Sequence, residues 1–314
     1  MNEKVKWLVV GIGDITTKRV LPAIQAHARS ELHGIVTRSP EKAAPYSCSV
    51  YPSLDVALRD SGAQAVYVAT PVALHVPQTT AALRAGKHVL CEKPLGMNYT
   101  EAKSAVDAAK SENRLFGVSY YRRFYPKLQK AKELIVAGAI GQPVLCEANC
   151  HGWFAAEEGH RAWLLDPQMA GGGPLYDIAS HRIDAINYLF GNPARACGFL
   201  SNAVHRYAVE DNASVLIEYA SGTRGYVDVR WHSRVDRDQF RIIGTDGEIQ
   251  LSPLNGPVIE WPGGTEELPA HPNLHYPLIA NFAESILDQT SLLSSGQTAL
   301  WTDWITEQLS LRLS

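Results

Sequence analysis

The chain has 314 residues, of which 46% are apolar and 19% charged, a composition typical of a globular protein large enough for two domains. Its net charge of −3 comes without a basic block, which argues against nucleic acid or an anionic membrane surface as a partner. The five cysteines form no CxxC pair, and no apolar run approaches the length of a membrane span. We therefore expect a soluble protein of the reducing cytoplasm.

Short apolar strands alternate with helical patterns through the first third of the chain. Strands are predicted over 6–12, 31–38, 63–70, 88–93 and 115–120, and helices over 16–28, 53–60, 75–86 and 99–113. This alternation requires right-handed crossovers and a parallel sheet. Residues 1–120 are therefore predicted to form an α/β domain of the Rossmann type.

The pattern changes near Tyr120. An amphipathic helix is predicted over 127–141, and period-two patterning predicts strands over 143–152, 194–204, 212–220, 223–232 and 239–251. Helices over 276–288 and 296–312 close the chain. Residues 121–314 are thus predicted to form a second α/β domain with a large, open, mainly antiparallel sheet. Two of its strands carry apolar residues partly on both faces, which favours self-association through the sheet as a homodimer or homotetramer.

Two glycines, Gly11 and Gly13, stand between the first strand and the first helix. Side chains there would block the tight turn or keep a pyrophosphate from the backbone N–H groups at the helix N-terminus. The third position of this dinucleotide fingerprint holds Thr16 instead of a small residue. A glycine-rich turn without a ligand therefore remains an alternative.

The second strand ends without the acid that usually holds the ribose hydroxyls of NAD. Thr37 and Arg38 occupy this place, with Lys42 nearby. Without the acid a 2′-phosphate is not repelled, and Arg38 could pair with it. NADP(H) is therefore the preferred cofactor and NAD(H) the alternative, in which Arg38 is only a solvated loop residue.

Three glycines over 171–173 lead into a helix that carries Asp177, His181 and Asp184. Residues three and four apart share one face of a helix, so Asp177 could orient the imidazole of His181 for proton transfer. A metal site is a weaker alternative, because no second set of ligands is evident. A helix-capping Asp and a satisfied histidine are the simplest alternative.

Six segments in this order together resemble the glucose–fructose oxidoreductase / inositol dehydrogenase (Gfo/Idh/MocA) family over nearly the whole chain. They are "GIGDI", "ATPVALH", "AGKHVLCEKPLGM", "YYRRFYPKLQKAKELIVAGAIGQP", "WLLDPQMAGGGPLYDIASHRID" and "IIGTDGEIQL". The resemblance implies a Rossmann domain followed by an α/β domain on an open antiparallel sheet. Three departures are Thr16, Val72 in place of the asparagine of "TPN", and Ala179 in place of a frequent glycine.

The resemblance also implies the roles of individual residues. Lys93 of the EKP element would lie by the nicotinamide and the substrate hydroxyl, preceded by Glu92 and followed by a cis peptide to Pro94. His181 would be the proton donor or acceptor, assisted by Asp177. The implied cofactor contacts are Gly11, Gly13, Asp14, Ile15, Thr37, Arg38, Lys42, Thr70, Pro71, His75, Glu92, Lys93 and Arg122. The implied substrate contacts are Tyr120, Trp163, Asp177 and His181.

Aromatic and polar residues surround the loop before the three glycines: His151, Trp153, His160, Arg161 and Trp163. They suit a polyhydroxylated ligand, and they suit a subunit interface or a lid equally well. The sequence thus predicts an NADP(H)-preferring oxidoreductase that acts on a sugar, a cyclitol or a related hydroxy or keto compound, with no metal. A cofactor-dependent glycosidase and a catalytically silent ligand sensor of the same fold are the alternatives.

Overall fold

The computed structural model describes residues 3–60, 62–155 and 161–310. The chain packs into two compact units, of residues 1–121 with 271–300 and of residues 122–270 with 301–314. A boundary at residue 120 would leave all of 271–300 in the second domain. The structure instead returns this segment to the first unit, which we call the return segment.

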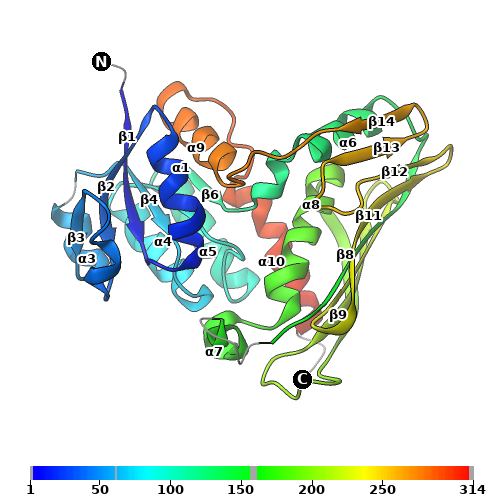
Figure 1. Ribbon diagram of the computed structural model, residues 1–314, viewed down its shortest axis with the longest axis horizontal. Helices are drawn as coiled ribbons and strands as arrows, with labels where there is room; N and C mark the ends of the chain where they lie inside the picture. Colours follow the sequence, from blue (N-terminus) through cyan, green and yellow to red (C-terminus); the bar gives the residue numbers. More distant parts are fainter. Residues whose placement is uncertain (1–2, 61, 156–160, 311–314) are drawn as a thin grey trace. The chain divides into compact units, whose positions relative to one another are not determined.

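The first unit contains a six-stranded parallel sheet in the order β3-β2-β1-β4-β5-β6 (Figure 1). Its strands are β1 (Val5–Val10), β2 (Ser30–Val36), β3 (Ser49–Tyr51), β4 (Ala65–Val68), β5 (His88–Cys91) and β6 (Phe116–Val118). This confirms the predicted Rossmann-type sheet. The short strand β3 was not predicted, because its three residues are mostly exposed and show no apolar run.

Helices connect these strands as the alternating pattern requires. They are η1 (Thr16–Val20), α1 (Leu21–Ala26), α2 (Pro40–Ala43), α3 (Leu54–Asp60), η2 (Val72–Leu74), α4 (His75–Arg84) and α5 (Tyr99–Ser111). The return segment adds α9 (Tyr276–Asp288), which packs on the sheet through Phe282 against Trp7, with ring centroids 5.5 Å apart. This apolar contact explains why a segment so late in the chain belongs to the first unit.

The second unit is built on an eight-stranded sheet in the order β14-β13-β12-β11-β7-β10-β9-β8. All its neighbours are antiparallel except β7 and β10, which confirms the predicted mainly antiparallel sheet. The strands are β7 (Pro143–Trp153), β8 (Pro193–Ser201), β9 (Asn212–Tyr219), β10 (Arg224–Arg230), β11 (His232–Gly244), β12 (Glu248–Gln250), β13 (Val258–Trp261) and β14 (Gly264–Glu267).

Helices η3 (Tyr121–Phe124), α6 (Pro126–Val136), η4 (Ala162–Leu165), α7 (Pro167–Ala170), η5 (Leu175–Ala179) and α8 (Ser180–Phe190) follow the switch of pattern near Tyr120. Helix α8 is buried along nearly its whole length and packs on β10. The last helix, α10 (Gly296–Ser310), begins in the first unit and ends in the second. No helix of the described residues is both long and apolar enough to cross a membrane.

The face of this sheet opposite α8 is more polar than the sequence pattern suggests. Asp228 of β10 is only 4% exposed and accepts hydrogen bonds from His151, Arg230, Ser214 and Tyr226, at 2.8 to 3.1 Å. The guanidinium and the two hydroxyls help to hold the pKa of Asp228 below its usual value in spite of burial. A carboxylate network therefore stands where partly apolar strands were expected.

Candidate active site

The glycine turn follows β1 and shows why two glycines are needed there. Gly11 has a φ of +92°, and a Cβ on it would lie 2.7 Å from the carbonyl oxygen of Ala69. A Cβ on Gly13 would meet no atom within 4 Å. Gly11 is thus required by packing, whereas Gly13 borders open space that a side chain would fill. This space fits the approach of a dinucleotide pyrophosphate to the backbone.

Thr16 replaces the third small residue of the fingerprint without filling the turn. Its side chain is fully buried, and its hydroxyl accepts from the N–H of Gly13 and donates to the Gly13 carbonyl, both at 2.7 Å. The Thr16 hydroxyl thus binds both backbone groups of Gly13 and stabilises the turn. The neighbouring Asp14 pairs with Lys18 at 2.7 Å on the surface, and Ile15 is 37% exposed.

The end of β2 carries no carboxylate. The Thr37 hydroxyl accepts a hydrogen bond from the N–H of Ser39 at 3.0 Å, which shapes the turn into α2. Arg38 and Lys42 are both exposed. The exposed side chains of Arg38 and Lys42 could therefore bind an anionic group at the end of β2.

The end of β4 is tied to the end of β5 by the buried His75. One ring nitrogen lies 2.8 Å from the Thr70 carbonyl oxygen and the other 2.8 Å from the Pro94 carbonyl oxygen. Burial lowers the pKa of His75. His75 therefore connects the turn at Thr70–Pro71 to Pro94.

Glu92, Lys93 and Pro94 follow β5, and the Lys93–Pro94 peptide is cis, as predicted. Glu92 accepts a hydrogen bond from the Tyr67 hydroxyl at 2.6 Å, and His275 of the return segment lies 3.4 Å from the same carboxylate oxygen. Burial opposes ionisation of Glu92, but His275, Tyr67 and Lys93 together lower its pKa to about 2.

The strand order brings these segments to one edge of the sheet. In an open parallel sheet, ligands bind at the carboxyl ends of the strands where the chain reverses its direction of winding. Here that point lies between β1 and β4, which are neighbours. The turn at Gly11–Gly13, the turn at Thr70–Pro71 and Lys93 all follow strands that end there.

Tyr120, Arg122 and Arg123, which lie at the predicted boundary after residue 120, occupy different environments. Tyr120 has no exposed surface and packs in the core of the first unit. Arg122 donates to the amide oxygen of Asn255 at 3.2 Å, within the second unit. Arg123 makes a buried two-bond pair with Asp184, at 2.9 and 2.5 Å. The last contact gives Asp184 a structural partner, and no group of three or more potential ligands for a metal ion occurs among the described residues.

The three glycines of the second unit are required by their neighbours. A Cβ on Gly171 or Gly172 would lie 2.6 or 2.5 Å from the ring of Tyr176, and one on Gly173 would overlap the carbonyl oxygen of Glu210. The Glu210 carboxylate in turn accepts from the N–H of Leu175 at 3.0 Å. Tyr176 and Glu210 therefore fill the space around the three glycines. The sequence pattern singles out neither residue.

Asp177 and His181 lie on consecutive turns after these glycines, but not on one regular α-helix. Asp177 belongs to the π-helical turn η5 and His181 to the first turn of α8. The Asp177 carboxylate accepts a hydrogen bond from Arg161 at 2.7 Å, and His181 is 7% exposed. π-Helical turns are frequent at functional sites because they re-aim the side chains of one turn.

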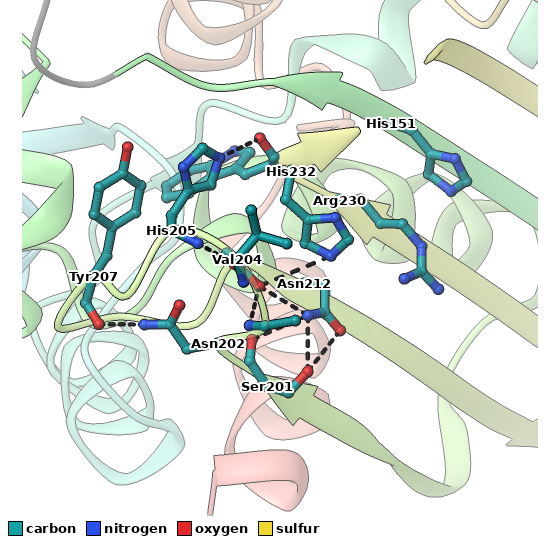
Figure 2. A network of polar contacts seen from close by, with 12 residues as sticks. His151, Ser201, Asn202, Val204, His205, Tyr207, Asn212, Arg230 and His232 are labelled. Carbon is teal, nitrogen blue, oxygen red and sulfur yellow. Dashed lines mark hydrogen bonds and ion pairs between the residues drawn. The ribbon is translucent and has the colours of Figure 1, made fainter. Parts of the chain in front are cut away.

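Figure 2 shows residues of the loop between β8 and β9, which is held by hydrogen bonds to Asp211. The carboxylate of Asp211 accepts from the backbone N–H groups of Ala203, Val204 and His205, at 2.7 to 2.9 Å. Burial opposes ionisation, but these three donors and Asn212 lower the pKa of Asp211 to about 2. One carboxylate thus holds three consecutive backbone N–H groups of the loop.

This loop carries part of an aromatic stack. His205 stacks on Tyr207 with centroids 4.7 Å apart (Figure 2). It also meets Trp153 edge-on at 4.6 Å, and its Nε2 lies 3.0 Å from the Trp231 carbonyl oxygen. Trp163 is 40% exposed on η4. His151 belongs instead to the Asp228 network, and His160 lies outside the described residues.

Comparison with known proteins identifies the class. A model of the oxidoreductase family with an NAD-binding Rossmann fold matches residues 5–120, so the first unit is the nucleotide-binding domain of an oxidoreductase. A model of the GFO/IDH/MocA C-terminal domain matches residues 128–250. The chain therefore belongs to the GFO/IDH/MocA family, as the six sequence segments implied.

Individual relatives cover almost the whole chain. It is 27% identical over 311 residues to 1,5-anhydro-D-fructose reductase of Ensifer adhaerens, covering 95% of this chain and 92% of the relative. It is 32% identical over 302 residues to dTDP-3,4-didehydro-2,6-dideoxy-alpha-D-glucose 3-reductase of Streptomyces violaceoruber, covering 88% and 84%. The crystal structure of aldose-aldose oxidoreductase from Caulobacter crescentus shares the fold, with a TM-score of 0.86, 24% identity and coverage of 97% and 96%.

Proposed function

We propose that this protein transfers a hydride between NADP(H) and a sugar, a cyclitol or a related hydroxy or keto compound. The observation that carries the proposal is the edge of the first sheet, where the open space at Gly13 and the residue Lys93 follow strands that meet at the winding reversal. Two relatives over most of the chain are named as reductases of sugar derivatives, which supports the substrate class.

The chemistry assigns a role to each polar residue. The nicotinamide, when bound, supplies or accepts the hydride, and a proton must leave or join the substrate oxygen at the same time. Lys93 as a cation would polarise that oxygen and stabilise alkoxide charge as it develops. His181 would move the proton, with Asp177 as its assistant, itself held by Arg161.

The preference for NADP(H) is part of the proposal. It is supported by the absence of a carboxylate at the first residues after β2 and by the exposure of Arg38 and Lys42. A guanidinium can bind a 2′-phosphate with two parallel hydrogen bonds, whereas a strand-end acid would repel it.

One experiment tests the assignment directly. A panel of sugars, polyols and their keto forms, including 1,5-anhydro-D-fructose, is followed at the nicotinamide absorbance with each cofactor. With the best substrate, Lys93→Met should lose about 10²–10³ in turnover, as other enzymes do when an electrostatic stabiliser is removed. NADPH binding measured by calorimetry should persist. Turnover close to that of the wild type would overturn the role of Lys93.

We also propose that two copies associate through the open face of the second sheet. Phe199 of β8 is 83% exposed and Leu216 of β9 is 48% exposed, which leaves apolar surface beside the Asp228 network. Light scattering at micromolar concentration should give a dimer or tetramer, and Phe199→Asp should weaken it. A monomeric wild-type protein would contradict the proposal.

A further inference from the structure

The return segment contains a buried histidine, His275, which lies beside Glu92 at the end of β5. His275 is 1% exposed and stands directly before α9. Its Nε2 lies 3.4 Å from Oε1 of Glu92, and its ring lies on Tyr121 with centroids 4.8 Å apart. A buried imidazole beside a buried carboxylate is costly to arrange unless the two groups stabilise each other.

His275 is placed by the helix that follows the glycine turn. Arg19 of η1 donates to the Pro272 carbonyl oxygen at 2.9 Å, and Asn273 donates to the Arg19 carbonyl oxygen at 2.8 Å. The amide oxygen of Asn273 then accepts the backbone N–H of His275 at 3.1 Å. The same helix thus supports the glycine turn and fixes the histidine that faces Glu92.

Glu92 is the link between His275 and Lys93. One carboxylate oxygen accepts from Tyr67, whose hydroxyl also lies 3.1 Å from the Ser119 hydroxyl. The other accepts from the backbone N–H of Lys93 at 3.3 Å. Glu92 therefore contacts directly the residue proposed as electrostatic stabiliser.

We propose that His275 is a positioning residue that acts through Glu92 on Lys93. The proposal rests on the role given to Lys93 above. A buried carboxylate draws the nearest cation to itself, and the ammonium group of Lys93 belongs to the adjacent residue. The imidazole of His275, 3.4 Å from Oε1, and the hydroxyl of Tyr67, at 2.6 Å, stabilise the Glu92 charge from its other side, which reduces this attraction. The ammonium group of Lys93 then remains directed toward the substrate oxygen.

The first test replaces His275 by phenylalanine, which keeps a ring on Tyr121 and removes both nitrogens. Turnover should fall about tenfold, because a polar partner of the Glu92 charge is lost, while calorimetric NADPH affinity stays within about twofold. His275→Gln restores an N–H donor and should recover part of the loss. The matched control is His33→Phe, because His33 lies on β2 of the same unit and its Nδ1 is 3.8 Å from the exposed Glu31, away from the contacts that place His275. It should leave turnover unchanged.

The second test asks whether the effect passes through Glu92. In a Glu92→Gln background, His275→Phe should lower turnover by less than about twofold, because the charge it acts on is gone. An equal loss in both backgrounds would overturn the proposal, as would a parallel loss of NADPH affinity. If Lys93→Met abolishes turnover and His275→Phe does not change it, only this proposal fails. If Lys93→Met retains turnover, the proposed function fails and this proposal with it.

Discussion

The chain contains two glycine-rich turns that lead into the same local structure and differ in what surrounds them. Gly11–Gly13 and Gly171–Gly173 each precede a π-helical turn, η1 or η5, which continues as an α-helix. Gly13 borders open space, whereas the three glycines of the second turn are pressed against Tyr176 and Glu210. The first turn thus leaves room for a ligand, and the second is filled by the protein itself.

The difference separates two uses of glycine that look alike in a sequence. At the first turn the missing side chain leaves open space at the backbone, which in the proposed function is taken by a pyrophosphate. At the second it lets the loop pack closely against Tyr176 and Glu210, directly before η5 and α8, which carry Asp177 and His181. A glycine cluster before a helix therefore indicates a close approach, but only the packing shows whether a ligand or the chain makes it.

The largest expected effect is a loss of turnover at His181, which follows the second turn. It tests whether this region takes part in catalysis without binding the cofactor. His181→Ala should lower turnover by about 10²–10⁴, because a proton-transfer group is lost. NADPH affinity by calorimetry should not change. In the wild type, the rate of oxidation should rise with pH, since the neutral imidazole accepts the proton, and the rate of reduction should fall. A pH dependence that survives in His181→Ala would assign the proton transfer to another group.

The sequence could supply those elements whose signal is local. The helix over 276–288 was predicted with the bounds that α9 has, because its apolar residues recur at helical spacing. The cis peptide before Pro94 came from the family resemblance. The packing of the return segment in the first unit depends on a contact between Phe282 and Trp7, which no local pattern reveals.

The residues of the candidate site also differ in whether a local sequence pattern reveals them. Gly13, Lys93, Asp177 and His181 stand in motifs that can be read in sequence. Glu210, Asp211 and His275 could not be singled out, because each acts through partners far along the chain. The π-helical turn at Asp177 was also missed, because its five residues are too few for apolar spacing to distinguish it from an α-helical turn.

Replacing one glycine of each turn by alanine tests directly whether the glycine is needed for packing or for ligand binding. Gly173→Ala should lower the free energy of unfolding by about 1–3 kcal/mol, because the new methyl group overlaps the backbone of Glu210. Gly13→Ala should leave the urea midpoint nearly unchanged and weaken NADPH at least about tenfold, or 1.4 kcal/mol. Equal destabilisation by both changes would show that the open space at Gly13 has no functional meaning.

Glu92 of the first unit and Asp211 of the second are held in different ways. Asp211 is bound mainly by backbone N–H groups and Glu92 by side chains, although both have a pKa of about 2. A depressed pKa gives stability that is present above the unfolded value of about 3.9 and lost as pH falls through about 2. Asp211→Asn should therefore cost about 2 kcal/mol at pH 7, with the difference shrinking toward pH 2.

The control for this measurement is Asp236→Asn, which removes an exposed carboxylate of the same unit. Its free energy of unfolding should change by less than about 0.5 kcal/mol at any pH. A cost for Asp211→Asn that does not depend on pH would mean that the carboxylate charge has no part in fixing the loop.

The smallest expected effect concerns the cofactor and sharpens the role of the first turn. Thr37→Asp combined with Arg38→Ala should weaken NADPH by about tenfold or more and strengthen NADH, both measured by calorimetry. An aspartate after β2 would repel the 2′-phosphate and accept hydrogen bonds from the ribose hydroxyls. Arg38→Lys is the matched control, because it keeps the charge but cannot bind a phosphate through two parallel bonds. It should lose less NADPH affinity than the double variant. Tighter binding of NADH than of NADPH by the wild type would show that Arg38 is a solvated surface residue, and that the missing acid at the end of β2 does not select the cofactor.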